Sequence, residues 1–180
     1  RDKKIFFLIS QNQPLVLTSF ALGEKVKFSI SSRKEYILRY LQSYTSEKST
    51  MHWIERTVDR NDIVWDIGAN VGMYTIYAAL VREAAVYALE PESQNYSLLN
   101  MNIKLNKLDH LVSAYCLGAS DKDTFDYIFM GNLNAGDGNH AVGEPLNFEL
   151  NSFHENIGFA QGCITFKLDT LIETKKLPIP

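Results

Sequence analysis

Two carboxylates end two consecutive apolar runs in the middle of the chain. Asp66 closes the run 63–66, and Glu90 closes the run 86–90. Between them lies 68–72, a turn of small residues that leads into a helical pattern. In an open parallel sheet, ligands bind beyond the carboxyl ends of the strands. An acidic residue at the second strand end can accept hydrogen bonds from both ribose hydroxyls of an adenosine. The spacing therefore predicts a nucleoside site at this turn.

The turn itself favours S-adenosylmethionine over a dinucleotide. The dinucleotide fingerprint, read from Gly68, needs glycine where the chain has Asn70 and Met73. What remains is Asp-x-Gly-x-Asn-x-Gly, opened by the carboxylate of Asp66. That carboxylate would repel a pyrophosphate but can hold a cationic amino group. An NAD-dependent dehydrogenase is consequently the weaker of the two enzymatic interpretations.

The elements around the turn alternate between strand and helix, which predicts a parallel α/β sheet with right-handed crossovers. Before them, we expect residues 1–60 to form an N-terminal lead-in, and we expect 61–180 to form a partial domain that contains the cofactor-binding half. Expected strands of the lead-in are 5–9 and 26–30, and its expected helices are 34–44 and 51–58. In the second part we expect strands at 63–66, 86–90, 111–117, 125–130 and 163–168, with helices at 72–82 and 95–108 and a short one from 168.

Four stretches of the sequence resemble the FkbM family of S-adenosylmethionine-dependent methyltransferases. They are WDIGANVGMYTIYAAL, VYALEPESQNYSLLNMNIKLNKL, LGASD and LDTL, within residues 50–175. The resemblance implies a Rossmann-like class I methyltransferase sheet with flanking helices. It also implies O-methylation, as of a sugar or natural-product hydroxyl.

The resemblance assigns roles to particular positions. Glu90 would accept the ribose hydroxyls, Pro91 would lie beside the adenine, and Ser120 with Asp121 would lie at the adenine edge. The positions of the first cofactor motif are Asp66, Gly68, Ala69, Asn70 and Gly72.

The family pattern continues with a fourth core strand after the segment at 168–171, and this sequence ends before it. We therefore expect a sheet truncated before its fourth core strand. A catalytically incomplete or degenerate domain that serves as a binding module is the alternative function.

The irregular region contains the candidate catalytic base. Methyl transfer depends mainly on positioning of the nucleophile, but a base helps a hydroxyl acceptor to lose its proton. Of His140 and His154, both in the region with many glycines and asparagines, we take His140 as the candidate. The loop 132–137 lacks the bidentate Glu of a calcium loop in register, so we expect no metal site.

Composition and charge restrict the partners. The net charge is −3 and the pI is about 5.8, with Lys and Arg scattered in short groups. A duplex-binding surface normally has a concentrated positive patch, so we expect a small-molecule or glycan acceptor and no nucleic acid. No apolar run approaches the roughly 20 residues of a membrane span, and we expect a cytoplasmic protein. Cys116 and Cys163 have no CxxC partner, which predicts two buried core residues. The oligomeric state does not follow from the sequence.

Overall fold

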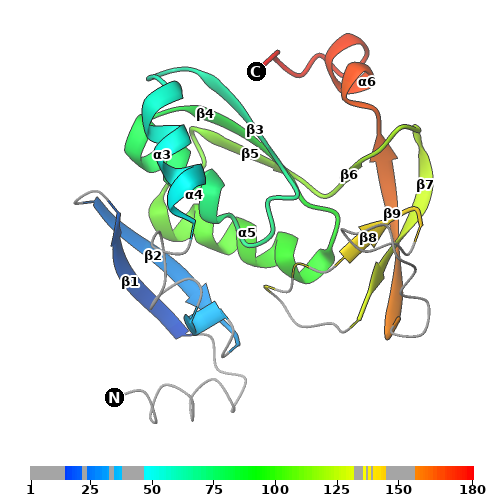
Figure 1. The fold of residues 1–180 in the computed structure, drawn as a ribbon, viewed down its shortest axis with the longest axis horizontal. Coiled ribbons are helices and arrows are strands. Elements are labelled where there is room, and N and C mark those ends of the chain that lie inside the picture. Colours follow the sequence, from blue (N-terminus) through cyan, green and yellow to red (C-terminus); the bar gives the residue numbers. More distant parts are fainter. Residues whose placement is uncertain are drawn as a thin grey trace.

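The computed structural model describes residues 15–21, 24–32, 35–37, 47–131, 136, 138, 140–144 and 157–180 (Figure 1). The expected strand 5–9, His154 and most of the expected helix 34–44 lie outside the described residues. The same holds for nearly all of the loop 132–137, for which no metal was expected.

A parallel sheet with its crossover helices forms the centre of the fold, as predicted. Strand order is β3-β4-β5, and both strand pairs are parallel. Val86, Ala88 and Leu89 of the middle strand are at most 1% exposed, which is why this run contains no polar residue before Glu90. The elements are β3 (Ile63–Ile67), α4 (Met73–Arg82), β4 (Ala85–Leu89), α5 (Ser93–Asn106) and β5 (Val112–Tyr115). This architecture is the Rossmann-like α/β fold expected of a class I methyltransferase.

Helix α4 is buried on more than one side. Met73, Ile76, Tyr77, Ala78 and Ala79 are all buried, because the helix lies between the sheet and α3 (Lys48–Thr57). Met51 and Ile54 of α3 complete this layer of the core. The predicted helices 51–58 and 72–82 thus correspond to α3 and α4.

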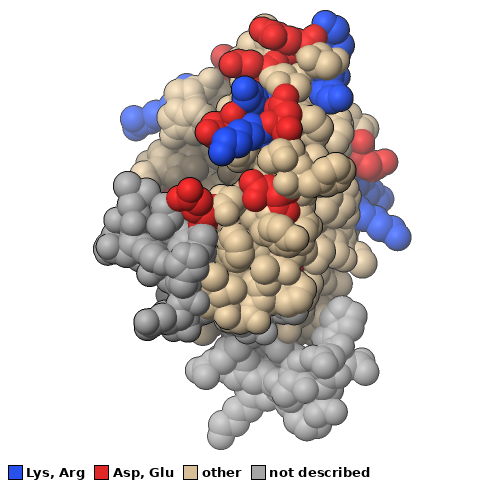
Figure 2. Space-filling view, turned by 90° about the vertical axis from the view of Figure 1, so that its right-hand side faces the viewer, with Lys and Arg blue, Asp and Glu red and all other residues tan. Residues whose placement is uncertain are grey.

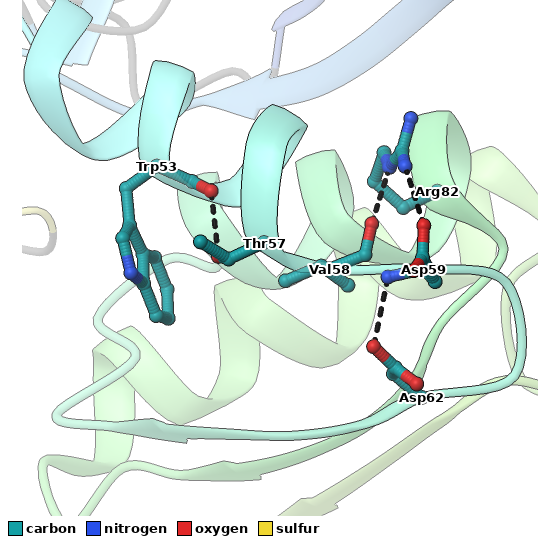
Figure 3. Close-up of polar contacts among 6 residues, drawn as sticks. All are labelled: Trp53, Thr57, Val58, Asp59, Asp62 and Arg82. Atoms are coloured by element: carbon teal, nitrogen blue, oxygen red, sulfur yellow. Dashed lines mark hydrogen bonds and ion pairs between the residues drawn. The ribbon is translucent and has the colours of Figure 1, made fainter.

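The turn between α3 and β3 is fixed by Arg82 of α4 (Figure 3). Its Nε donates to the carbonyl oxygen of Val58 at 2.6 Å, and its Nη2 lies 3.2 Å from Oδ1 of Asp59. The backbone N–H of Asp59 donates to Oδ2 of Asp62 at 2.8 Å. These bonds fix the start of β3, and therefore also the position of Asp66 near the end of that strand.

A groove runs beside β3, on the side away from β4. Trp53 of α3, which is 56% exposed, lines it together with Ile67 and Leu168, and Figure 3 shows the Trp53 ring extending away from the helix. Trp65 donates from Nε1 to the carbonyl oxygen of Pro178 at 3.0 Å. The residues that follow α6 (Leu168–Glu173) therefore pass close to this edge of the sheet.

A second sheet follows the parallel one. Its strand order is β6-β9-β7-β8, with β7 antiparallel to both of its neighbours. The two strands expected at 125–130 and 163–168 are confirmed, and the structure pairs them with each other, whereas two shorter strands were not predicted. The elements are β6 (Gly118–Ala119), β7 (Thr124–Met130), β8 (His140–Val142) and β9 (Phe159–Phe166). Two or three residues are too few to show a periodic pattern, so β6 and β8 leave no signal in the sequence.

An antiparallel hairpin precedes these sheets and packs on α5. It consists of β1 (Leu15–Ala21) and β2 (Glu24–Ile30), which contains the expected strand 26–30. Asn102 Oδ1 accepts from the backbone N–H of Ser29 at 2.8 Å. Asn106 accepts from the N–H of Lys27 and donates to its carbonyl oxygen. The hairpin is therefore attached to α5 by hydrogen bonds between the asparagine side chains of the helix and the main chain of β2.

The expectation of two buried cysteines is wrong. Cys116 is exposed and Cys163 is partly exposed, and both are free thiols. Cys116 follows the end of β5, and Cys163 belongs to β9 of the second sheet, much of which is accessible. Among the described residues, no helix is long and apolar enough to cross a membrane.

Candidate functional site

The turn after β3 is attached to the end of β4. The backbone N–H groups of Gly68 and Ala69 both donate to the carbonyl oxygen of Leu89, at 2.9 and 3.0 Å. Gly68 has a φ of +77°, and a Cβ built on it meets nothing within 4 Å. The backbone at Gly68 therefore faces open space, as it must if a ligand is to approach it closely.

Gly72 has a different structural role in the same turn. Its φ is +88°, and a Cβ there would lie 2.5 Å from Cδ1 of Leu99, a fully buried residue of α5. Asn70, with a φ of +52°, is a residue type that tolerates this left-handed region. Gly72 is thus required for packing of α4 against α5, while Gly68 leaves room for a ligand.

Glu90 lies at the centre of the site. It is 4% exposed, and its two oxygens accept backbone hydrogen bonds from different loops. Oε2 accepts from Asn70 at 2.7 Å, and Oε1 accepts from Glu92 at 2.8 Å. The pKa of Glu90 is raised to about 7: burial is the largest cause, the two backbone hydrogen bonds lower the pKa, and the charges of Glu92 and Asp66 raise it, the net result being this value.

Asp66 lies beside the first turn of α4. Its Oδ2 accepts a hydrogen bond from Oγ1 of Thr75 at 2.5 Å. Burial raises the pKa of Asp66, and the hydrogen bonds from Thr75 partly offset that effect. A carboxylate at a helix N-terminus is stabilised by the orientation of the peptide dipoles. Asp66 therefore supports the turn as well as bearing charge.

The three carboxylates Asp66, Glu90 and Glu92 make this a site for a cation. Glu92 caps α5 by accepting from the backbone N–H groups of Gln94 and Asn95. S-adenosylmethionine carries a sulfonium and an ammonium, so the negative potential favours it, and the same potential disfavours the pyrophosphate of NAD. With the open backbone at Gly68, the residues present fit S-adenosylmethionine.

The loop between β4 and α5 is held by a residue that the sequence did not reveal. Pro91 is buried, and its carbonyl oxygen accepts from Nε2 of Gln161, on β9, at 2.8 Å. Sγ of Cys116 also approaches that oxygen, at 3.9 Å. Gln161 is separated from Pro91 by 70 positions, so only the fold could bring the two together.

The remaining predicted residues lie in or directly after the strands of the second sheet. Ser120 and Asp121 follow β6, and the N–H of Ser120 donates to the carbonyl oxygen of Phe166 at 3.0 Å. His140 lies in β8, opposite Met130, and is partly exposed. The structure thus brings together Asp66, Glu90 and the small-residue turn, while Ser120 and Asp121 follow β6 and His140 belongs to β8.

A parallel sheet with this turn and these carboxylates defines a Rossmann-like class I methyltransferase domain. A family model described as the TRM5/TYW2 methyltransferase domain matches residues 27–138, and the chain belongs to this family. Membership in this family confirms S-adenosylmethionine, the cofactor that the sequence predicted. No curated protein matches the chain.

Solved structures with a similar fold include two TYW2 proteins. That of Pyrococcus horikoshii, in complex with MeSAdo, is 23% identical, with a TM-score of 0.45 over 57% of this chain and 36% of that chain. That of M. jannaschii, in complex with AdoMet, is 27% identical, with a TM-score of 0.42 over 57% of this chain and 43% of that chain. A complex of aTrm5 with tRNALeu is 25% identical, with a TM-score of 0.40 over 54% of this chain and 26% of that chain. The chain thus spans less than half the length of each.

Two expectations change with this assignment. The S-adenosylmethionine-dependent methyltransferase class is confirmed, but the matching family is TRM5/TYW2, and FkbM membership and O-methylation do not follow from it. The expectation of a small-molecule or glycan acceptor without nucleic acid is wrong, because aTrm5, which bears the family's name, forms a complex with tRNALeu. That expectation used a criterion for duplex binding, whereas RNA is also recognised through unstacked bases.

Proposed function

We propose that this chain is the cofactor-binding part of an S-adenosylmethionine-dependent methyltransferase that acts on RNA of the tRNA class. The observation that carries the proposal is that the Glu90 carboxylate joins the turn after β3 to the loop after β4, beside the open backbone of Gly68. Family membership and the tRNALeu complex of aTrm5 support the acceptor.

The residues of the site have distinct roles in this proposal. The Glu90 carboxylate accepts the two ribose hydroxyls with the lone pairs that its backbone partners leave open. Asp66 holds the ammonium group, directly or through water. Gly68 and Ala69 allow the ligand to lie against their backbone, and Pro91 borders the base. When bound, S-adenosylmethionine supplies an electrophilic methyl group, and the protein contributes chiefly by positioning.

The second sheet offers a surface for the acceptor. Phe125, Tyr127 and Phe129 lie on one face of β7, and we call them the aromatic strip. Phe125 is 86% exposed and Tyr127 is 57% exposed, and the rings of Tyr127 and Phe129 lie 6.4 Å apart between centroids. Aromatic side chains on a sheet face can stack unpaired bases, each stack being worth about 1–3 kcal/mol.

Small residues keep this face open. Gly162 of β9 pairs with Tyr127, Ala160 pairs with Phe129, and a Cβ on Gly162 would meet nothing within 4 Å. Figure 2 shows the side of the molecule on which β7 and β9 lie in Figure 1: Lys and Arg are mixed with Asp and Glu at its upper end, and charged side chains are sparse below. Binding at the strip would therefore depend on stacking more than on phosphate contacts.

The cofactor part of the proposal is tested by calorimetric titration of the full chain with S-adenosylhomocysteine. We expect micromolar binding, and no binding of NAD, which serves as the control. Binding of NAD alone would refute the proposal. Binding of S-adenosylhomocysteine without methyl transfer to any RNA would favour the alternative, a domain that retains the cofactor site as a binding module.

The acceptor part is tested by incubating the chain with tritiated S-adenosylmethionine and bulk tRNA. Label in tRNA, and none in duplex DNA, is the expected result. The sequence-based prediction of an oxygen acceptor is tested in the same material, because methylation of a ribose 2′-hydroxyl makes the adjacent phosphodiester resistant to alkali. Label released entirely as mononucleotides would contradict transfer to that oxygen.

A further inference from the structure

We infer that Gln161 is a positioning residue for the cofactor, acting from β9 of the second sheet on the loop that follows Glu90; this inference rests on the proposed function. The amide group of its side chain makes two hydrogen bonds to main-chain atoms of that loop. Nε2 donates to the carbonyl oxygen of Pro91 at 2.8 Å, and Oε1 accepts from the N–H of Ser93 at 3.1 Å. One side chain thus binds a donor and an acceptor two residues apart.

The bond to Ser93 completes the N-terminus of α5. The first N–H groups of a helix have no partner within it. The N–H groups of Gln94 and Asn95 are bound by the Glu92 carboxylate, and that of Tyr96 by the Glu92 carbonyl oxygen. The N–H of Ser93, the first residue of α5, is left for Gln161. A residue of the second sheet therefore supplies one part of the cap.

The bond to Pro91 bears directly on the cofactor site. Pro91 follows Glu90, whose Oε1 accepts from the N–H of Glu92. The segment 90–93 is thus held at one end by the carboxylate bond within the loop and at the other by Gln161. Among the described residues, loss of the Gln161 amide would leave the Pro91 carbonyl oxygen with the weak approach of the Cys116 thiol. The Glu90 carboxylate would then be less well oriented for the ribose.

The test compares Gln161→Ala with a control on the same strand. Thr165 is fully buried in β9, and its hydroxyl donates to the carbonyl oxygen of Lys122, away from the loop that follows Glu90. Affinity for S-adenosylhomocysteine is measured by calorimetry and stability by thermal melting, both on the full chain. We expect Gln161→Ala to bind roughly tenfold more weakly, while Thr165→Val melts earlier and binds within about twofold of the wild type.

Two further measurements separate positioning from folding. In Gln161→Glu, the side chain can accept from Ser93 but donates to Pro91 only when protonated, so its affinity relative to wild type should recover as the pH is lowered. Hydrogen exchange at the Ser93 N–H should accelerate in Gln161→Ala. Wild-type affinity in Gln161→Ala would overturn the inference and leave the proposed function intact. Absence of binding by the wild-type chain would instead overturn the proposed function.

Discussion

The backbone N–H of Asn70 donates to Oε2 of Glu90 at 2.7 Å, so the two motifs that predicted the cofactor are joined to each other. Asn70 belongs to the turn after β3, and Glu90 directly follows β4. The carboxylate proposed to bind the ribose therefore also fixes the distance between the two loops. Its removal should affect the site and the fold together.

Substitution of Glu90 should weaken cofactor binding strongly. Glu90→Ala removes the proposed ribose acceptor and leaves the N–H groups of Asn70 and Glu92 without their partner. We expect a loss of roughly 1.5–3 kcal/mol in the binding of S-adenosylhomocysteine. Calorimetric titration measures it, with Glu24→Ala on the exposed start of β2 as the control. Equal affinities in the two variants would remove Glu90 from the site.

The pKa of Glu90 predicts how stability depends on pH. The folded value is about 7 and the ordinary value is 4.5, so the folded chain holds more protons in this window. The free energy of unfolding should therefore fall as the pH rises from 4.5 to 7, by about 3 kcal/mol in total from this group. Urea unfolding at several pH values measures the slope. Glu90→Gln should flatten it, and an unchanged slope in that variant would assign the effect to another group.

The same titration affects ligand binding with the opposite sign. A ribose hydroxyl donates to the charged carboxylate, so affinity for S-adenosylhomocysteine should rise as the pH increases through about 7. Calorimetry at pH 6 and pH 8 is sufficient to detect it. Tighter binding at pH 6 would mean that the protonated acid is the binding form.

Gly68 and Gly72 should respond to alanine in opposite ways. Both have positive φ, so each substitution carries a strain of roughly 1 kcal/mol. Only Gly72→Ala also collides with Leu99, and it should be the less stable variant. Gly68→Ala places its methyl group in open space that we assign to the ligand, and should lose more affinity. Thermal melting measures the stability of each variant, and calorimetry measures its affinity for S-adenosylhomocysteine. Lower stability in Gly68→Ala together with lower affinity in Gly72→Ala would contradict the roles that we assign to the two glycines.

The aromatic strip predicts a surface that affects RNA and not the cofactor. Phe125→Ala combined with Tyr127→Ala should weaken binding of bulk tRNA by about 1–3 kcal/mol for each ring that stacks a base. Binding of S-adenosylhomocysteine should be unaffected. Trp53→Ala is the matched control, because Trp53 is as exposed as Tyr127 but lies beside β3. If the control and the double variant lose RNA affinity equally, the strip has no specific role.

The sequence predicted the parallel half of the fold because its strands are apolar and their ends are chemically distinctive. Asp66 and Glu90 stand at strand ends, so sequence position alone placed them together at one edge of the sheet. The contact between Gln161 and Pro91 was not predictable, since a glutamine in an alternating strand normally indicates a solvated face. Ser120 and Asp121 were carried over from a family pattern, and their place at the adenine edge stays a prediction; the structure places them directly after the short strand β6, where the N–H of Ser120 donates to Phe166. The acceptor was misjudged because net charge is insensitive to exposed rings such as that of Phe125.

The attachment of the hairpin to α5 determines where the chain can be shortened. Asn102 is fully buried. Its side chain accepts from the N–H of Ser29 in β2 and donates to the carbonyl oxygen of Val71, in the turn after β3. A chain starting at residue 61 would lose the partner of its Oδ1 and expose the helix face that Phe28 covers. The family match likewise begins at residue 27, within β2. Hairpin, helix and turn should consequently unfold as one cooperative unit, and protease cleavage between β2 and α3 should release no independently folded methyltransferase fragment.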